Sequence, residues 1–280
     1  DEEKLSFLRK NSVGMLVSMD GDKETHDTNR KFIDGSESFQ VIFEKVPLIL
    51  KHYPNMSVRM TLTPDTAQSF FHDVQFLLRA GFKRVECVPN SFVVWSENTL
   101  EELRQQLRLI SNDYIKHFST NYLSGGFREF TRGFRDVKRV NAAYVNGSHR
   151  CDGCARCGIG IDNQAAINYL GDIYPCHEAN CDDELRIGNI FTGIDNSRRV
   201  ALSKQYSQSK VYGLNCGTCL FDHVCNGGCA VFNYMIYHDF NHMPQMACAW
   251  KQMILDECEY ILSQMERKKN IIFRNYFLGL

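Results

Sequence analysis

The chain has 280 residues, a formal net charge of −1 and 12 cysteines. Its length allows one large or two modest domains, and its near-neutral charge gives no electrostatic sign of nucleic-acid binding. No apolar run approaches membrane-spanning length and the polar, acidic start is unlike a signal peptide, so we expect a cytoplasmic protein that binds neither nucleic acid nor membrane.

Residues 1–118 are predicted to alternate between helices and strands. Apolar spacing indicates helices at Glu2–Lys10, at Ser38–His52, from Pro64-Asp65 to Ala80 with Gly81 as the stop, and across Leu100–Tyr114. Short apolar runs predict strands at Gly14–Met19, Ser57–Thr63 and Arg84–Val88. Strands alternating with helices imply a parallel sheet with right-handed crossovers, although three such units cannot close a barrel.

The rest of the chain has a different composition. We expect residues 119–150 to form a connector, and residues 151–250 to form a turn-rich, cysteine-rich domain with little periodic secondary structure. Such a domain has few apolar runs, and we expect bound metal to stabilise its fold. Residues 251–280 are expected to be a C-terminal helix and tail, the helix starting near Met246 and ending near Met265.

Cysteine spacing is the most specific signal in the chain. It reads Cys157-x13-Gly171-x4-Cys176, then Cys216-x2-Cys219-x5-Cys225-x3-Cys229-x18-Cys248. Thiolates select iron–sulfur clusters or zinc. Eight thiolates would fill two cubane clusters, and Cys151 is available as the eighth. The C-x-x-C pairs and the missing signal peptide favour metal ligation over disulfides.

The pattern resembles the SPASM domain of radical S-adenosylmethionine (SAM) enzymes, a domain that carries two auxiliary [4Fe–4S] clusters. Further segments also resemble that family: Val17–Gly21, His26-Asp27, Arg30 and Asp34–Ser36 are similar to its fourth barrel strand and following loop, and Gly171–Cys176 and Cys225–Cys229 to SPASM segments. The resemblance implies an α/β fold: the C-terminal part of a partial (β/α)6 TIM-like barrel (1–118), the connector (119–150), a metal-stapled SPASM domain (151–250), and the helix and tail (251–280).

One motif of that family is missing. Its radical-generating [4Fe–4S] cluster sits on a C-x3-C-x2-C loop, and the Cys151-x2-Cys154-x2-Cys157 spacing does not match it. The resemblance would place the first three strands, this third cluster and much of the SAM site upstream of Asp1. We therefore expect the chain to be the C-terminal part of a longer enzyme and not to cleave SAM alone.

The resemblance also implies the cluster ligands. Auxiliary cluster I would be held by Cys151, Cys157, Cys176 and Cys229, and cluster II by Cys216, Cys219, Cys225 and Cys248. Cys154 could replace Cys151, because both lie in one Cys-Asp-Gly-Cys turn, and structural zinc remains an alternative because tetrahedral thiolate sites also use C-x-x-C pairs. Cys87 and Cys258 fall outside the pattern and are most simply small buried hydrophobes.

Three other positions are candidates for the reaction site. His177 follows Cys176, where relatives that mature sulfatases carry a proposed aspartate base; it is a catalytic candidate or a surface histidine. Ser18 and Arg59 lie on predicted barrel strands, and Arg59 could bind the SAM carboxylate or a neighbouring acidic residue. His26, with Asp27 and Arg30, is expected to fix the loop after the first strand by hydrogen bonds.

The resemblance implies a radical SAM/SPASM maturase that abstracts hydrogen from a peptide or protein substrate through a 5′-deoxyadenosyl radical, for example in ribosomal peptide cross-linking. An electron donor such as flavodoxin or ferredoxin would be a partner. Anaerobic sulfatase maturation, which generates formylglycine, shares every motif except an aspartate at 177. A non-catalytic iron–sulfur electron-transfer or binding module is the alternative from another class, and a zinc-binding interaction protein a further one.

Overall fold

The computed structural model describes residues 1–117, 126–146, 164–180, 182–207, 212–214, 216, 218, 219, 225 and 227–267, with side chains described except at 138–146, 206, 207, 266 and 267. The chain divides into two compact units, which we call the first unit (1–138 with 250–280) and the second unit (139–249).

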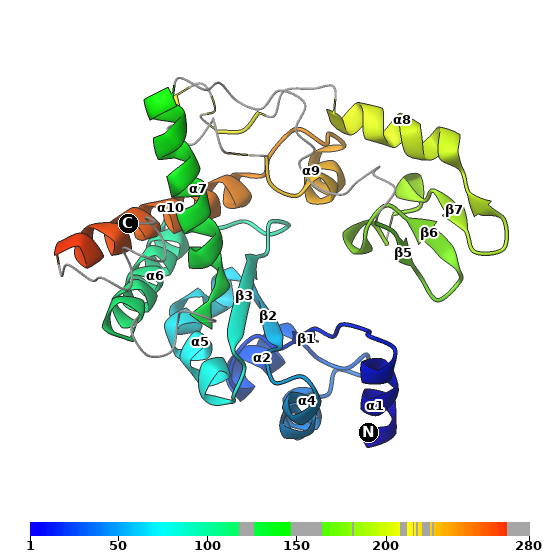
Figure 1. Ribbon diagram of the computed structural model, residues 1–280, viewed down its shortest axis with the longest axis horizontal. Coiled ribbons are helices and arrows are strands. Elements are labelled where there is room, and N and C mark those ends of the chain that lie inside the picture. Colours follow the sequence, from blue (N-terminus) through cyan, green and yellow to red (C-terminus); the bar gives the residue numbers. More distant parts are fainter. Residues whose placement is uncertain are drawn as a thin grey trace. The chain divides into compact units, whose positions relative to one another are not determined.

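A parallel sheet of four strands organises the first unit, in the order β1-β2-β3-β4, and Figure 1 shows β1, β2 and β3 side by side. The strands are β1 (Val17–Ser18), β2 (Ser57–Leu62), β3 (Arg84–Pro89) and β4 (Gly126–Phe127). Its helices are α1 (Glu2–Lys10), α2 (Lys23–Asn29), α3 (Phe39–Phe43), α4 (Val46–His52), the 3₁₀ helix η1 (Pro64–Ser69), α5 (Phe70–Arg79), α6 (Glu97–His117), most of the described part of α7 (Arg128–Asn146), and α10 (Gln245–Arg267) from Trp250 onward. The predicted parallel α/β fold is confirmed.

The two faces of this sheet differ in polarity. Val58, Met60 and Leu62 of β2 are fully buried, whereas Arg59 and Thr61 between them are partly exposed. This alternation follows from strand geometry, because successive side chains point to opposite faces. The apolar face therefore belongs to the core, and the other face carries the polar residues Arg59 and Thr61.

Aromatic side chains brought from distant segments complete the core of the first unit. Phe70 meets Phe127 edge-on, with ring centroids 5.7 Å apart, and Trp250 lies 6.1 Å from Phe70. Phe130, one turn into α7, is edge-on to Phe127 at 5.0 Å. Such pairs favour offset and edge-to-face arrangements. These contacts tie β4, α7 and α10 to the sheet.

The structure departs from the sequence expectations at several places in the first unit. The helix predicted over Ser38–His52 is two helices, α3 and α4, with Pro47 in the first turn of the second. The segment after Pro64 begins as the 3₁₀ helix η1 before α5. The segment 119–150, expected to be a connector, supplies β4 and the long helix α7, because Phe127, Phe130 and Phe134 are buried in the core.

The second unit contains a small antiparallel sheet, in the order β5-β6-β7-β8. Its elements are β5 (Ala166–Ile167), β6 (Asp172–Tyr174), the 3₁₀ helices η2 (His177–Ala179) and η3 (Asp183–Leu185), β7 (Gly188–Asn189), β8 (Gly193–Ile194), α8 (Asn196–Ser207), α9 (Ala230–Tyr237) and the start of α10. A buried cluster holds them together: Tyr174, Cys176, Ala179, Leu185, Ala230, Val231 and Phe240. The described part of this segment therefore contains more secondary structure than the sequence predicts.

Among the described residues, no helix combines the length and the apolar character that crossing a membrane requires.

Candidate cluster and cofactor sites

Four cysteine thiols of the second unit gather near the start of α10. Cys248 lies in the first turn of that helix, and Cys216, Cys219 and Cys225 come from the loop segments before α9. The pKa of Cys248 is raised, first by burial and then by the neighbouring thiols of Cys225, Cys219 and Cys216. Because each of the three acts electrostatically on Cys248, the four sulfurs share one small region.

The spacing of these sulfurs bears on which metal group they fit. Tetrahedral zinc with Zn–S bonds of about 2.3 Å holds its four sulfurs about 3.8 Å apart. Among the described residues, the group of three potential ligands whose atoms lie within 4.8 Å of one another is Asp22, His72 and Asp73, so no three of these thiols are that close. Both a zinc ion and a [4Fe–4S] cluster can be held by four cysteine thiolates.

Glycines and an asparagine shape the loop between Cys225 and Cys229. Gly227 and Gly228 both adopt left-handed conformations, with φ of 78° and 72°, which glycine reaches without steric cost. The Gly227 N–H donates to Cys225 Sγ at 3.5 Å. Asn233, fully buried on α9, donates to the Gly227 carbonyl at 2.9 Å and to the Phe240 carbonyl at 3.0 Å. The loop is thereby fastened to the helix that follows Cys229.

Cys176 and Cys229 form a second pair of thiols. Cys176 follows β6 and is buried, and Cys229 occupies the position before the first residue of α9. The pKa of Cys229 is raised to about 11, first by burial and to a lesser extent by Cys176 and Glu178, although backbone N–H groups of Phe232 and Val231 oppose the shift. Such a thiol is protonated at neutral pH, and a metal would have to displace its proton.

The remaining predicted ligands lie outside the described residues. These are Cys151 and Cys157, together with the alternative ligand Cys154. Cys181 also lies outside them. Cys87 on β3 and Cys258 on α10 are buried free thiols of the first unit, with pKa values raised well above normal, chiefly by burial.

His177 opens the 3₁₀ helix η2. Its side chain is 73% exposed, and its Nε2 lies 3.1 Å from Glu178 Oε1. In the sequence it directly follows Cys176, one of the second pair of thiols. This exposed, paired geometry is that of a surface histidine with an acidic neighbour.

Ser18 and Arg59 lie side by side on the polar face of the sheet. The register pairs Ser18 with Arg59 and Arg59 with Glu86, so these three residues form one row across three neighbouring strands. Glu86 also forms ion pairs with Arg128 and, at 3.4 Å, with Arg132 of α7. Sequence reasoning missed Glu86, whose signal was a charged residue between the apolar residues Val85 and Cys87.

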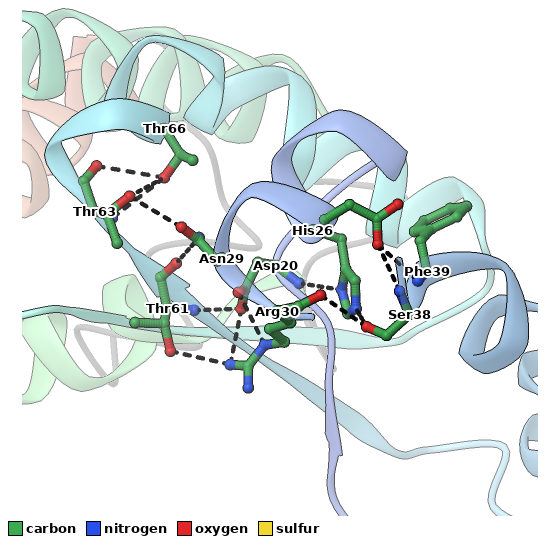
Figure 2. A network of polar contacts seen from close by, with 10 residues as sticks. Asp20, His26, Asn29, Arg30, Ser38, Phe39, Thr61, Thr63 and Thr66 are labelled. Carbon is green, nitrogen blue, oxygen red and sulfur yellow. Dashed lines mark hydrogen bonds and ion pairs between the residues drawn. The ribbon is translucent and has the colours of Figure 1, made fainter. Parts of the chain in front are cut away.

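A network of polar contacts closes the segment after β1 (Figure 2). Arg30 donates from Nε and Nη2 to the two oxygens of Asp20, and Asp20 Oδ1 also accepts from the Thr61 N–H at 2.8 Å. His26 Nδ1 accepts from the Asp20 N–H at 3.4 Å, which leaves Nε2–H to donate to Ser38 Oγ at 3.0 Å. Burial lowers the pKa of His26, so the ring is neutral.

Asp27 completes this network at the start of α3. Its Oδ1 accepts from the N–H groups of Ser38 and Phe39, both at 2.9 Å, and Lys23 bonds to Oδ2 at 3.0 Å. The expectation that His26, Asp27 and Arg30 fix this part of the chain by hydrogen bonds is confirmed. The first two lie on the short helix α2 rather than in a loop.

Comparisons with known proteins identify relatives of this chain. No protein-family model matches the chain. It is 25% identical over 248 residues to the cysteine-type anaerobic sulfatase-maturating enzyme of Clostridium perfringens (strain ATCC 13124), over 82% of this chain and 61% of that protein, and 21% identical to the enzyme of the same name from Clostridium novyi, over 82% and 60%. The chain is homologous to these enzymes and spans about three fifths of their length.

Solved structures share the fold. Native anSMEcpe with bound AdoMet has a TM-score of 0.68 at 18% identity, over 95% of this chain and 72% of that one. SuiB of Streptococcus suis, bound to S-adenosylmethionine, has a TM-score of 0.53 at 14% identity, over 89% and 56%. Structures of anSMEcpe with the Cp18Cys peptide and of SuiB with the precursor peptide SuiA have the same fold.

Proposed function

We propose that the chain is the auxiliary-cluster part of a radical SAM maturase that modifies a peptide or protein. The observation that carries the proposal is the group of four thiols around Cys248. It occurs in a chain homologous to anaerobic sulfatase-maturating enzymes and sharing their fold. Because the chain spans 61% of that relative, the proposal concerns the activity of the whole protein to which these residues belong.

We assign the thiols to two clusters. Cys216, Cys219, Cys225 and Cys248 would hold one [4Fe–4S] cluster, and Cys151, Cys157, Cys176 and Cys229 the other. When bound, such clusters accept or donate single electrons. The protein's own contribution is to bury the thiols, as at Cys229, and to direct N–H groups toward them, as Gly227 does toward Cys225.

SAM would lie on the polar face of the parallel sheet. There Arg59 offers a guanidinium for the SAM carboxylate, and Ser18 is its neighbour in the register. The carboxyl ends of parallel barrel strands are where barrel sites open. No C-x3-C-x2-C spacing occurs in the 280 residues. We therefore propose that these residues do not cleave SAM without a radical-generating [4Fe–4S] cluster from elsewhere in the protein.

Two substrate classes fit this proposal. The first is a ribosomal peptide that becomes cross-linked, in keeping with the fold shared with SuiB bound to its precursor peptide. The second is a sulfatase in which cysteine becomes formylglycine, which the homology to cysteine-type maturating enzymes favours. In the second case His177 would stand where relatives carry an aspartate base. A flavodoxin or ferredoxin would supply the electron.

Metal analysis of anaerobically reconstituted protein tests the cluster assignment. We expect about eight irons and eight sulfides per chain. Cys248→Ala should lose about half of both, whereas Cys258→Ala, on the same helix but buried in the first unit, should lose none. Zinc without sulfide, or equal iron loss in the two variants, would contradict the proposal.

Mass spectrometry of the full-length protein's products separates the two substrates. A sulfatase peptide converted to formylglycine loses its thiol sulfur and gains an aldehyde that a hydrazide traps. A cross-linked peptide keeps its sulfur and loses two hydrogens. If neither class of peptide changes while SAM is cleaved, the maturase proposal fails and an electron-transfer role is favoured.

A further inference from the structure

We propose that Asp22, His72 and Asp73 of the first unit form a binding site for a divalent transition-metal ion, separate from the cysteine sites. Asp22 precedes α2, and the other two lie on the first turn of α5. One ligand atom from each lies within 4.8 Å of the other two. The set joins an imidazole to two carboxylates from segments about fifty residues apart.

The distances suit a metal ion better than direct contact. His72 Nδ1 lies 3.5 Å from Asp22 Oδ2 and 3.8 Å from Asp73 Oδ1. Zinc bonds to nitrogen and oxygen of about 2.1 Å place tetrahedral ligands about 3.4 Å apart. A small inward movement of the three side chains would therefore complete the coordination. The His72 side chain makes no hydrogen bond to another described residue, so its ring nitrogen has no competing partner there.

Both carboxylates are held in place by the surrounding backbone. Asp22 Oδ1 accepts from the Thr25 N–H at 3.1 Å and thereby caps α2, while Oδ2 faces His72. Asp73, which is fully buried, accepts from the Asp22 N–H at 3.1 Å and from Thr25 Oγ1 at 2.9 Å. A metal would meet carboxylates already oriented by second partners, as in established metal sites.

Gly21 shows how closely the chain encloses Asp73. Its φ is 155°, and a Cβ at this position would lie 2.1 Å from Asp73 Oδ1. Only a residue without a side chain lets the backbone approach the carboxylate so closely. The sequence Gly21-Asp22 therefore supplies one ligand and the space for another.

The charges around Asp22 and Asp73 also favour a bound cation. Among the described residues, the ion-pair contacts of Asp22 and Asp73 are made with His72 alone, whose side chain is 58% exposed. Lys23, the next residue, is engaged by Asp27 and Glu37 instead. Two neighbouring carboxylates without a lysine or arginine partner attract a cation. The imidazole favours a transition metal such as Zn²⁺, and the two carboxylates also suit Mn²⁺.

Binding of Mn²⁺ to the cluster-loaded chain tests the site, because Mn²⁺ has little affinity for thiolates. Loss of the free-ion signal in electron paramagnetic resonance gives the bound fraction without reference to activity. We expect one saturable Mn²⁺ per chain. His72→Ala and Asp22→Asn should each weaken binding at least about tenfold. Asparagine retains the capping oxygen, so Asp22→Asn leaves α2 intact.

His117→Ala is the matched control. His117 Nδ1 lies 3.0 Å from Asp113 Oδ1 at the end of α6, so it is a histidine–aspartate pair that does not belong to the three-ligand group. This variant should bind Mn²⁺ as the unmodified chain does. No saturable binding below about 1 mM, or equal affinity in the His72 and Asp22 variants, overturns the proposal.

Discussion

Arg30 and Asp20 form a bidentate ion pair at the end of β1. Arg30 Nε donates to Asp20 Oδ2 at 2.9 Å and Nη2 to Oδ1 at 3.0 Å (Figure 2). The Asp20 side chain is fully buried and that of Arg30 is 32% exposed. Because Nη2 also donates to Thr61 Oγ1 at 3.2 Å, this pair joins the chain after β1 to the polar face of β2.

Removal of this arginine should destabilise the protein strongly. Arg30→Ala leaves the buried Asp20 carboxylate without its cation, and we expect a loss of about 3–5 kcal/mol in the free energy of unfolding. Arg104→Ala removes an exposed pair with Glu101 and should cost less than about 1 kcal/mol. Urea unfolding at neutral pH measures both. Equal losses would mean that the Arg30 pair is no stronger than a surface contact.

Asp73 should make stability fall with rising pH. Burial raises its pKa from 3.8 to about 6. Below the unfolded value both states hold the proton; as pH rises toward 6, the unfolded chain loses its proton while the folded chain keeps it. Relative to Asp73→Asn, the protein should therefore lose about 3 kcal/mol between pH 3 and pH 7.

Chemical unfolding of both proteins across that range, in buffers free of Mn²⁺ and Zn²⁺, measures the difference. A constant stability gap between Asp73 and its asparagine variant would contradict the raised pKa. The comparison isolates this group because other carboxylates, such as Asp27 with its lowered pKa, contribute equally to both proteins.

Gly133 and Cys258 should be energetically coupled. A Cβ at Gly133 would lie 2.5 Å from Cys258 Sγ and 3.0 Å from Ile254 Cγ2. Overpacking costs about 1–3 kcal/mol, partly offset by about 1 kcal/mol from the better helix propensity of alanine. Gly133→Ala should therefore destabilise the protein, and much less so in a Cys258→Ala background. A double-mutant cycle from urea unfolding tests this. Additive effects would show that Gly133 and Cys258 are not energetically coupled.

Arg59 should matter for SAM if the proposed function holds. Arg59→Ala should weaken SAM binding about tenfold or more, since a hydrogen bond between charged groups contributes about 1.5–3 kcal/mol. Arg84→Ala is the control, because Arg84 lies on β3 but donates to the Asn55 carbonyl at 2.7 Å. Calorimetric titration of the full-length protein measures both affinities. Unchanged SAM binding in the Arg59 variant would mean that Arg59 does not contribute to SAM binding.

Local patterns predicted the repetitive part of the fold. α1 occupies the predicted Glu2–Lys10, and β2 and β3 differ from prediction by one residue each, because helical and strand periodicities are properties of short segments. The break between α3 and α4 was missed because both halves carry apolar residues at helical spacing. The strand β4 was missed because two residues are too few for a period, and its partner Arg84 lies far away in sequence.

By itself, the sequence determined which residues can bind metal, since cysteine spacing and residue type state the chemistry of the ligands. Only the tertiary structure decided which distant residues meet, as where His72 faces Asp22 across about fifty residues of chain. The physical reason is that side-chain chemistry is local, whereas proximity between distant residues comes from burial of apolar surface along the whole chain.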